Sequence, residues 1–571
     1  MGAFFLYHKD SKITESLVDD LYALKGFKNP FKISIGSYNL VLFRKQAVNI
    51  MNYYKNGENY LFVVGSLFYK GSGYKESLEK LLNDFTKNCI EPQNLYGNYV
   101  MIFYANINKQ ITFCIDPAFI KNVYFDAGKK IITTDFLALI EAFPGFYSLN
   151  KTALIENLTT GSLISPDTYA KEIQKLDKVN ITTIELNFPG IRVQQIKPEI
   201  NESVYSYKTA VEQANKRLSE YFSAVRNLTD EFGAHIGLTG GFDSRLLLIH
   251  AKKRLKHLSV NSFWRDNSLE YLNAKELAKV SNLDFFTFED APYMMPGKEV
   301  MLVKSYYFFD GQIRSQNNWE EEFSLSDYTF RIASNNFVGF HGCGGEQYRN
   351  ANRLMRKMSL RTFIMNEWMF KQCLNVFSDI NLQKEVYQNI ENKILRLVNI
   401  ENSKVGLYEL KRIQNEVWNS ANRVTRVNLI NQQMFYFAPF TEYTVSMSAY
   451  DFVPYLGNSF SFQKEMMKEQ DKSLAGVKTN YGFNILEKEP LKYKIIPYIV
   501  NVIPRSLFYP IFFKRKNQQR NSFSVSEFEK NAHPVFLDLV QGINLDKLGK
   551  NINLGNSINS FNYFIKKTNL R

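Results

Sequence analysis

The sequence predicts an α/β protein, with an antiparallel α+β part first and a parallel sheet in the second part. Three observations predict this class. Strand-like segments separated by Asn, Gly and Asp fill residues 1–195, short apolar strands alternate with helical patterns from about residue 200, and helical patterns dominate beyond about residue 350. The length of 571 residues exceeds what a single core supports, which indicates two or more domains.

The first part contains segments rich in aromatic and β-branched residues, which favour strands. The expected strands lie within KISIGSYNLVLF (32–43), NYLFVVGSLFY (59–69), GNYVMIFYANINKQITFCID (97–116), NVYFDAGKKIITT (122–134) and KVNITTIELN (178–187). One amphipathic helix is expected among them, at YKESLEKLLNDFTKN (74–88).

The second part begins with a strong helical pattern at 201–227 and then alternates. Strands are expected at 235–238, 257–264 and 283–289, with helices starting near 246 and covering 268–282. Because this alternation is typical of βαβ units, it predicts a parallel sheet.

The turn after the first of these strands reads LTGGFDSR, residues 238–245. Gly240 and Gly241 allow the backbone to approach a ligand closely and to adopt positive φ. The following amides open a helix, whose N-terminus stabilises an anion, and Thr239 and Ser244 add hydroxyl donors. Asp243 adds a carboxylate suited to magnesium beside a phosphate. The turn is therefore interpreted as a pyrophosphate cradle, and an ordinary strand–turn–helix link is the alternative.

Composition limits the function further. The formal charge of +14 comes from scattered lysines, which is typical of a solvated surface, so no nucleic-acid partner is expected. The 4 cysteines form no Cys-x-x-Cys pair, and the charged N-terminus is unlike a secretory signal, so the expected location is the cytoplasm. Prolines interrupt the apolar segment 495–516, which favours a buried helix pair over a membrane span. A peripheral membrane contact is the alternative.

These residues together resemble a known family. LTGGFDSR is similar to the Ser-Gly-Gly-x-Asp-Ser pyrophosphate loop of the asparagine synthetase type, glutamine-dependent ATP-pyrophosphatases. Relatives in that group include β-lactam synthetases, lasso-peptide cyclases and synthetase-like proteins of surface-polysaccharide loci. Three further segments are similar to the family's second glycine-rich loop, its acceptor-side segment and its amidotransferase-like domain: FVGFHGCGGEQYRN (337–350), APFTEYTVSMSAYDFVP (438–454) and residues 96–140.

The resemblance implies a degenerate, Ntn-type amidotransferase-like domain over 1–195. An asparagine synthetase-like ATP-pyrophosphatase (PP-loop) domain with a helical C-terminal half is implied over 200–571. The family's glutaminases carry a nucleophilic cysteine after the initiator Met, and Gly2 stands there in this chain. Without a thiolate there is no thioester, so glutamine hydrolysis is not expected. Cys343 replaces the acidic residue that faces ammonia in the second loop, which favours a larger amine as the nucleophile.

The resemblance also implies the residues that would carry the chemistry. ATP would be bound by Leu238, Thr239, Gly240, Gly241, Phe242, Asp243, Ser244, Ser262 and Gly342. Mg²⁺ would be bound by Asp243 and Glu346. Lys464 would stabilise the departing pyrophosphate, and Glu442 or Tyr443 would act as general base, although a structural role is an alternative for each.

The implied function is an ATP-dependent amide-forming ligase that adenylates a substrate carboxylate, releases pyrophosphate and transfers the acyl group to an amine. Its product would be a modified peptide or a surface glycan. The sequence leaves three alternatives open: a lasso-type peptide macrocyclase, an RNA-modifying enzyme with a similar loop, and a catalytically inactive scaffold. A homodimer and a biosynthetic partner protein also remain open.

Overall fold

The computed structural model describes the chain except for residues 1, 49, 51, 108, 183–190, 200–205, 263–267, 288–297, 314–334, 351–356, 365–375, 401–403, 424, 458, 492, 494, 496–524, 550–551 and 571. The proline-interrupted segment expected to form a buried helix pair therefore lies almost wholly outside the described residues. Within the described chain, no helix is both long enough and apolar enough to cross a bilayer.

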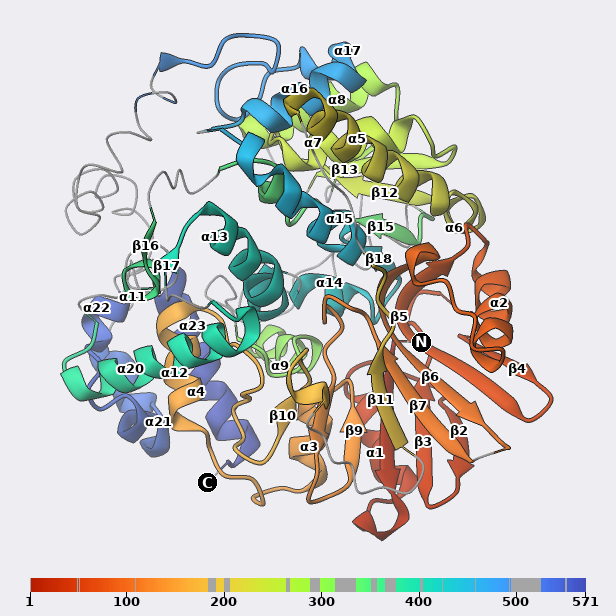
Figure 1. Cartoon of the computed structure of the whole chain (residues 1–571). Helices are drawn as coiled ribbons and strands as arrows, with labels where there is room; N and C mark the ends of the chain where they lie inside the picture. Colours follow the sequence, from red (N-terminus) through yellow and green to blue (C-terminus); the bar gives the residue numbers. More distant parts are fainter. Residues whose placement is uncertain are drawn as a thin grey trace.

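The first domain packs two sheets face to face (Figure 1). One sheet has the order β10-β8-β9-β1-β3-β2, from β1 (Ala3–His8), β2 (Phe31–Ile35), β3 (Tyr38–Phe43), β8 (Tyr124–Asp126), β9 (Ile131–Thr133) and β10 (Gln174–Lys175). The other has the order β11-β7-β6-β5-β4, from β4 (Tyr53–Asn56), β5 (Asn59–Tyr69), β6 (Leu95–Ala105), β7 (Gln110–Ile115) and β11 (Ile191–Gln195). Alternate side chains, such as those of Phe4 and Leu6 on β1 and Val100 and Ile102 on β6, fill the core between the sheets.

Pairing in both sheets is antiparallel except between β11 and β7, which run parallel. The domain also contains α1 (Glu15–Ala23), α2 (Tyr74–Thr86), α3 (Phe136–Ala142) and α4 (Lys151–Thr160). The strand expected at 178–187 is wrong where the structure describes it, because Asn180–Thr182 forms a 3-10 turn. Asp177 Oδ1 accepts hydrogen bonds from Val179 N and Asn180 N, and this local bonding favours a turn over a strand.

The predicted parallel sheet is confirmed. It has the order β14-β13-β12-β15-β18, from β12 (Ala234–Gly237), β13 (Leu258–Ser262), β14 (Phe285–Thr287), β15 (Val338–Phe340) and β18 (Phe435–Phe437). The helices of this part are α5 (Tyr207–Ala224), α6 (Arg226–Phe232), α7 (Asp243–Lys252), α8 (Leu269–Ser281) and α9 (Lys298–Phe308). Since α7 and α8 connect consecutive parallel strands, the region is built from βαβ units as the alternation predicts.

The remaining chain is mainly helical, as expected. Its helices are α11 (Leu360–Phe363), α12 (Ile380–Val398), α13 (Leu407–Ile413), a π-helix (Gln414–Arg423), α14 (Thr425–Ile430), α15 (Tyr443–Ser448), α16 (Ser461–Gln470), α17 (Lys472–Ala475), α20 (Val525–Asn531), α21 (Pro534–Leu539), α22 (Leu545–Gly549) and α23 (Ile552–Thr568). Two short strands, β16 (Met358–Ser359) and β17 (Lys404–Val405), pair antiparallel.

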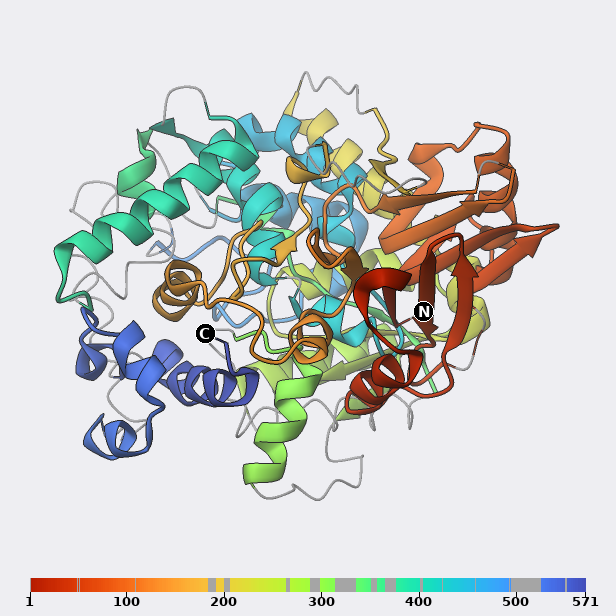
Figure 2. The ribbon, with the colours of Figure 1, turned by 90° about the horizontal axis from the view of Figure 1, so that it is seen from below.

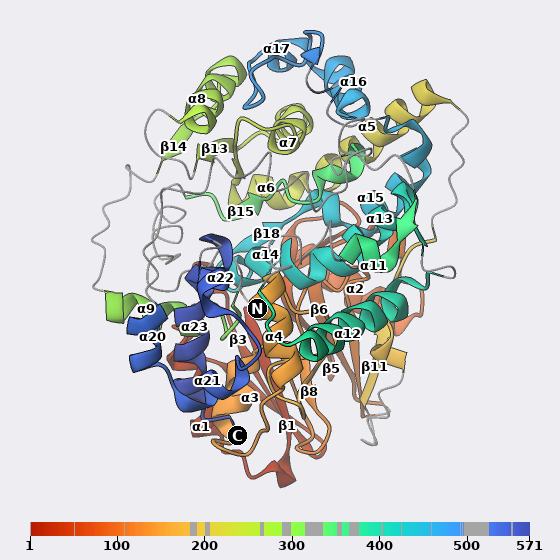
Figure 3. The same cartoon turned by 90° about the vertical axis from the view of Figure 1, so that its left-hand side faces the viewer.

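The C-terminal helices return to the first domain. Helix α23 lies beside α3 and α4, as Figures 2 and 3 show from two directions. Phe564 of α23 packs against Phe136 and Tyr169, with ring centroids 6.4 and 5.0 Å apart. The two ends of the chain therefore share one hydrophobic core.

The first domain also covers the edge of the parallel sheet. Strand β18 is that edge, and its Tyr436 N donates to Ser66 Oγ at 3.1 Å while Tyr436 O accepts from Asn98 Nδ2 at 3.1 Å. The neighbouring backbone is paired as well, since Gln46 N donates to Gln432 O at 3.0 Å. An edge strand that would otherwise present unpaired backbone groups is thus closed by the first domain.

Candidate functional site

The candidate site lies at the carboxyl edge of the parallel sheet, where residues 238–242 connect β12 to α7. Leu238 N donates to Asn261 O at 2.7 Å, which ties the start of the loop to β13. Ser262 lies buried at the end of β13, at the same edge. Ligands of open parallel α/β sheets bind in the crevice beyond this edge.

Hydroxyl groups hold the loop in shape. Thr239 N donates to Ser244 Oγ at 3.1 Å, and Gly241 N donates to Thr239 Oγ1 at 3.2 Å. Neither Gly240 nor Gly241 lies at positive φ, so the expectation that these glycines adopt positive φ is wrong. Both hydroxyls predicted as phosphate donors therefore help to fix the loop backbone.

A close approach explains why residue 240 is glycine. Asn480 N donates to Gly240 O at 3.0 Å, and a Cβ at position 240 would overlap the Asn480 carboxamide. That carboxamide is held by Asn273 Nδ2, which donates to its Oδ1 at 3.0 Å. Residue 240 is therefore glycine because it leaves space for the Asn480 side chain, and its backbone does not need positive φ.

Phe242 anchors the loop in the core. Its ring is buried and stacks on Phe460, with centroids 4.8 Å apart and planes 14° apart, and Tyr481 lies against it at 5.3 Å. Helix α7 follows directly, and in the described chain its N-cap residue makes no side-chain capping bond. Its first-turn amides and the positive end of its dipole therefore face the loop, as an anion site requires.

The second glycine-rich segment packs directly on the first. It follows β15, and a Cβ at Gly342 would lie 3.1 Å from Ser244 N. A Cβ at Gly345 would overlap the Asp243 carboxylate, so only glycine fits there. Cys343 N donates to His341 Nδ1 at 3.1 Å, which shapes the segment. The structure thus brings together two loops that lie about a hundred residues apart in the sequence.

Asp243 is the centre of a polar cluster that the sequence analysis missed. Arg349 Nη1 donates to Asp243 Oδ1 at 2.8 Å, and Nη2 donates to Oδ2 at 3.0 Å. Gln463 Nε2 donates to the same Oδ1 at 2.8 Å, and its own Oε1 accepts from Arg349 at 2.9 Å. Burial raises the pKa of Asp243, Arg349 opposes this rise, and the charge of Glu346 adds to it.

The carboxylates Asp243 and Glu346 fit one kind of metal site. Magnesium is usually held by one or two carboxylates together with substrate phosphates. Gly345 packs against the Asp243 carboxylate, and Glu346 is the next residue along the chain. In the described part of the chain, no group of three or more His, Cys, Asp or Glu side chains is arranged to hold a metal. A magnesium ion completed by phosphate would use both carboxylates, and Arg349 would first have to release an oxygen of Asp243.

The predicted pyrophosphate lysine points elsewhere. Lys464 Nζ donates to Glu487 O at 2.8 Å and lies 4.0 Å from Glu489 Oε1. It is the preceding residue on α16, Gln463, that contacts Asp243. Arg245 also points away from the loop, since its Nη2 donates to Lys478 O at 2.7 Å. Arg349, unlike Lys464, contacts the carboxylate of the first glycine loop, since both of its Nη atoms donate to Asp243.

The predicted general bases lie at the junction with the first domain. Glu442 Oε2 accepts from Gly97 N at 3.1 Å, and Oε1 accepts from Tyr221 at 3.4 Å. Burial, with the charge of Asp116 nearby, raises the pKa of Glu442 to about 8. Tyr443 is half-buried, and burial raises its pKa too. At neutral pH Glu442 is largely protonated, so its surroundings favour a structural role and its role as a base stays a prediction.

The position of the missing nucleophile is closed. A Cβ at Gly2 would lie 2.7 Å from the Phe27 ring and 2.8 Å from Gln432 O. Gly2 N donates to Phe43 O at 2.8 Å, as part of the sheet. A cysteine side chain has no space here, which agrees with the expected loss of glutamine hydrolysis.

No protein-family model matches this chain, and a comparison with curated proteins finds no match. The resemblance to ATP-pyrophosphatases therefore stays a prediction from the sequence.

Proposed function

We propose that the protein is an ATP-dependent ligase that joins a carboxylate to an amine and releases AMP and pyrophosphate. The observation that carries this proposal is the contact between the two glycine loops, with Gly345 packed on Asp243 at the carboxyl edge of a parallel sheet. The phosphates of ATP would lie against residues 238–244, at the N-terminus of α7.

A buried polar group at the same edge supports a bound ligand. The Asn261 side chain is 2 % exposed, and neither its Oδ1 nor its Nδ2 has a hydrogen-bond partner among the described residues. An unpaired buried carboxamide is unfavourable by about 1–3 kcal/mol. A ligand with both donors and acceptors, such as a nucleotide, would satisfy it.

Arg349 is the group that we assign to the leaving pyrophosphate. Its guanidinium is bound to Asp243 in a bidentate pair, the geometry that also suits phosphate oxygens. Phosphates arriving at the loop would compete for Arg349 and leave Asp243 and Glu346 for magnesium. The magnesium would neutralise phosphate charge. Arg349 would then donate to the oxygens of the departing pyrophosphate, while Gln463 keeps Asp243 oriented.

The closed position of Gly2 supports an amine that does not come from glutamine. Carboxylates and amines of a modified peptide or of a surface glycan suit this chemistry, including a lasso-type peptide ring closure. An inactive scaffold of the same fold is the second candidate. One observation favours it: both oxygens of Asp243 accept hydrogen bonds from Arg349, so the carboxylate is engaged within the protein.

ATP–pyrophosphate exchange separates these two candidates. The full chain is incubated with magnesium, ATP, labelled pyrophosphate and a panel of peptide and uronic-acid carboxylates, with and without amines. Exchange is expected with one class of acid, with a loss of about 100-fold in Asp243→Asn and Arg349→Met. Glu465→Gln is the matched control, because Glu465 is an exposed residue of α16 that pairs with Lys468 at 3.7 Å.

Two outcomes of the exchange assay would contradict the ligase proposal. Exchange that survives in Asp243→Asn means that the chemistry lies elsewhere. No exchange, together with no ATP binding by calorimetry, means that the ligase proposal fails and the scaffold replaces it.

A further inference from the structure

A basic cleft lies where the first domain meets the parallel sheet, away from the glycine loops. Its volume is about 630 Å³, within the usual range for small-molecule sites. The turn after α1, the segment after β3, helix α9 and Gln433 form its walls. Gln433 stands just before β18, at the amino edge of the sheet, whereas both glycine loops follow the carboxyl ends of their strands. The cleft is therefore separate from the proposed ATP site.

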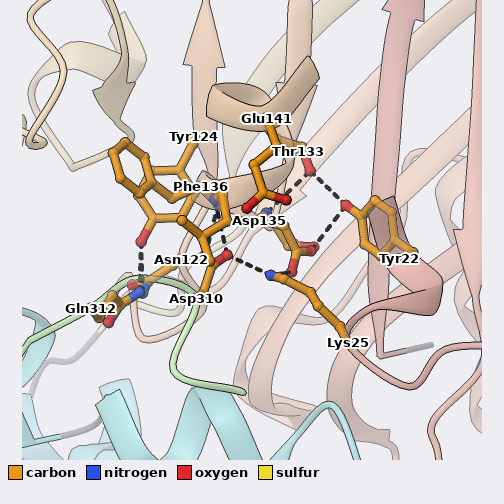
Figure 4. A network of polar contacts seen from close by, with 12 residues as sticks. Tyr22, Lys25, Asn122, Tyr124, Thr133, Asp135, Phe136, Glu141, Asp310 and Gln312 are labelled. Atoms are coloured by element: carbon orange, nitrogen blue, oxygen red, sulfur yellow. Dashed lines mark hydrogen bonds and ion pairs between the residues drawn. The ribbon is translucent and has the colours of Figure 1, made fainter. Parts of the chain in front are cut away.

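The cleft carries a net positive charge. Lys28, Arg44, Lys45 and Lys304 line it, and the described lining residues include no acidic side chain. Lys25 also lines it, but its ammonium lies between Asp135 and Asp310 behind the wall (Figure 4). Lys45 is buried with its ammonium bound to backbone carbonyls, so the positive charge facing the cleft comes from Lys28, Arg44 and Lys304.

The wall that carries these cations is firmly held. Lys45 is 2 % exposed, and its Nζ donates to Met434 O at 2.9 Å and also to Asn431 O. The adjacent Ala47 N donates to Gln433 O at 2.9 Å. Backbone pairing between the two domains therefore fixes Arg44 and Gln433 relative to each other before any ligand binds.

A buried hydrogen-bond acceptor of Gln433 is a second observation, independent of the charges, that favours a ligand in the cleft. Its side chain is 4 % exposed, and its Oε1 has no hydrogen-bond partner among the described residues. A buried acceptor without a donor is unfavourable, so this wall favours a ligand that brings a hydroxyl or an N–H group. The apolar faces of Phe27 and Tyr307 line the same cleft and offer packing for a ring.

We propose that this cleft binds a hydroxyl-bearing phosphate ester of the size of a sugar phosphate or a mononucleotide. The phosphate lies among Arg44, Lys304 and Lys28, and a hydroxyl of the ligand donates to Gln433 Oε1. The ring of the ligand packs against Phe27 and Tyr307. The site is additional to the ligase function, and it remains if that function is wrong.

The test is calorimetry on the full chain, without ATP or magnesium, using glucose 6-phosphate, AMP, inorganic phosphate and glucose as probes. One of the two esters is expected to bind. Its identity shows whether the phosphate of the ligand is carried by a sugar or by a nucleoside. Arg44→Gln and Lys304→Gln are each expected to weaken its binding about fivefold to tenfold. Lys208→Gln is the control, since Lys208 is an exposed residue of α5 that makes only a long i,i+4 pair at 3.7 Å.

Two further variants test the geometry. Gln433→Met is expected to weaken the ester about fivefold while leaving inorganic phosphate unchanged, because only the ester carries sugar hydroxyls in addition to its phosphate. Asp243→Asn is expected to leave binding unchanged, which separates this site from the proposed ATP site. The proposal is overturned if neither ester binds at about 10 mM. It is also overturned if inorganic phosphate binds as tightly as the esters, or if Arg44→Gln and Lys304→Gln bind like the control.

Discussion

Replacing Arg349 by methionine tests whether this residue compensates the charge of Asp243. Removing one partner of a buried ion pair destabilises a protein by about 3–5 kcal/mol. The Asp243 side chain is 22 % exposed and keeps its hydrogen bond from Gln463, so we expect a smaller loss, about 2–3 kcal/mol. Because the entropy of unfolding is about 2.1 cal/mol/K per residue, the midpoint of thermal unfolding of the 571-residue chain is expected to fall by about 2 °C.

The pH dependence provides the decisive comparison. Burial raises the pKa of Asp243 even with Arg349 present, and removing Arg349 raises it further. A carboxyl whose pKa is raised in the folded state binds its proton more tightly there, so the folded state gains stability as the pH falls through that pKa. The loss in Arg349→Met should therefore shrink by about half between about pH 7.5 and about pH 5. Scanning calorimetry measures this loss of stability at each pH. The double variant Asp243→Asn/Arg349→Met should recover most of the lost stability. An equal loss at both pH values, or no recovery in the double variant, would refute the argument.

Three other substitutions follow from single contacts. Gly240→Ala should lower the free energy of unfolding by about 2 kcal/mol, because the new Cβ would overlap Asn480. In calorimetry the double variant Gly240→Ala/Asn480→Ala should recover this stability. No recovery would contradict the overlap with Asn480 as the cause. Because the pKa of Glu442 is raised to about 8, the folded state should lose about 2 kcal/mol as the pH rises from about 6 to about 8. Glu442→Gln should flatten that slope in melting curves, whereas an unchanged slope would assign it to another group. Lys25→Met should lower stability by about 3–5 kcal/mol by leaving Asp135 and Asp310 unpaired, and Lys25→Arg serves as the charge-preserving comparison.

Local pattern was enough to predict the parallel sheet and the position of its first loop. The strands and helices of that region are set by periodicity within about 15 residues, and the glycine turn lies between them. The second loop was found by resemblance, and its contact with Asp243 is consistent with that resemblance. The strand expected near 180 failed because short polar side chains there bond to their own backbone.

Local sequence patterns could not predict the residues that hydrogen-bond to Asp243. Arg349 is 106 residues away in sequence and Gln463 is 220 residues away, so only the fold brings them to the loop. Arg349 lies within the second-loop segment 337–350, and its place three residues after Glu346 was the signal that the sequence offered. Lys464 was predicted because the resemblance implies a lysine there, yet it is Gln463, one position earlier, that contacts Asp243.

The first domain supports the second part of the chain at three places. Its residues close the edge of β18, its strand β6 supplies the backbone N–H that binds Glu442, and its helices share a core with α23. Each of these contacts buries a group of the second part that would otherwise meet water or remain unpaired. The sheet that carries both glycine loops therefore depends on the first domain to cover one of its edges, a structural role that needs no catalytic residue at position 2.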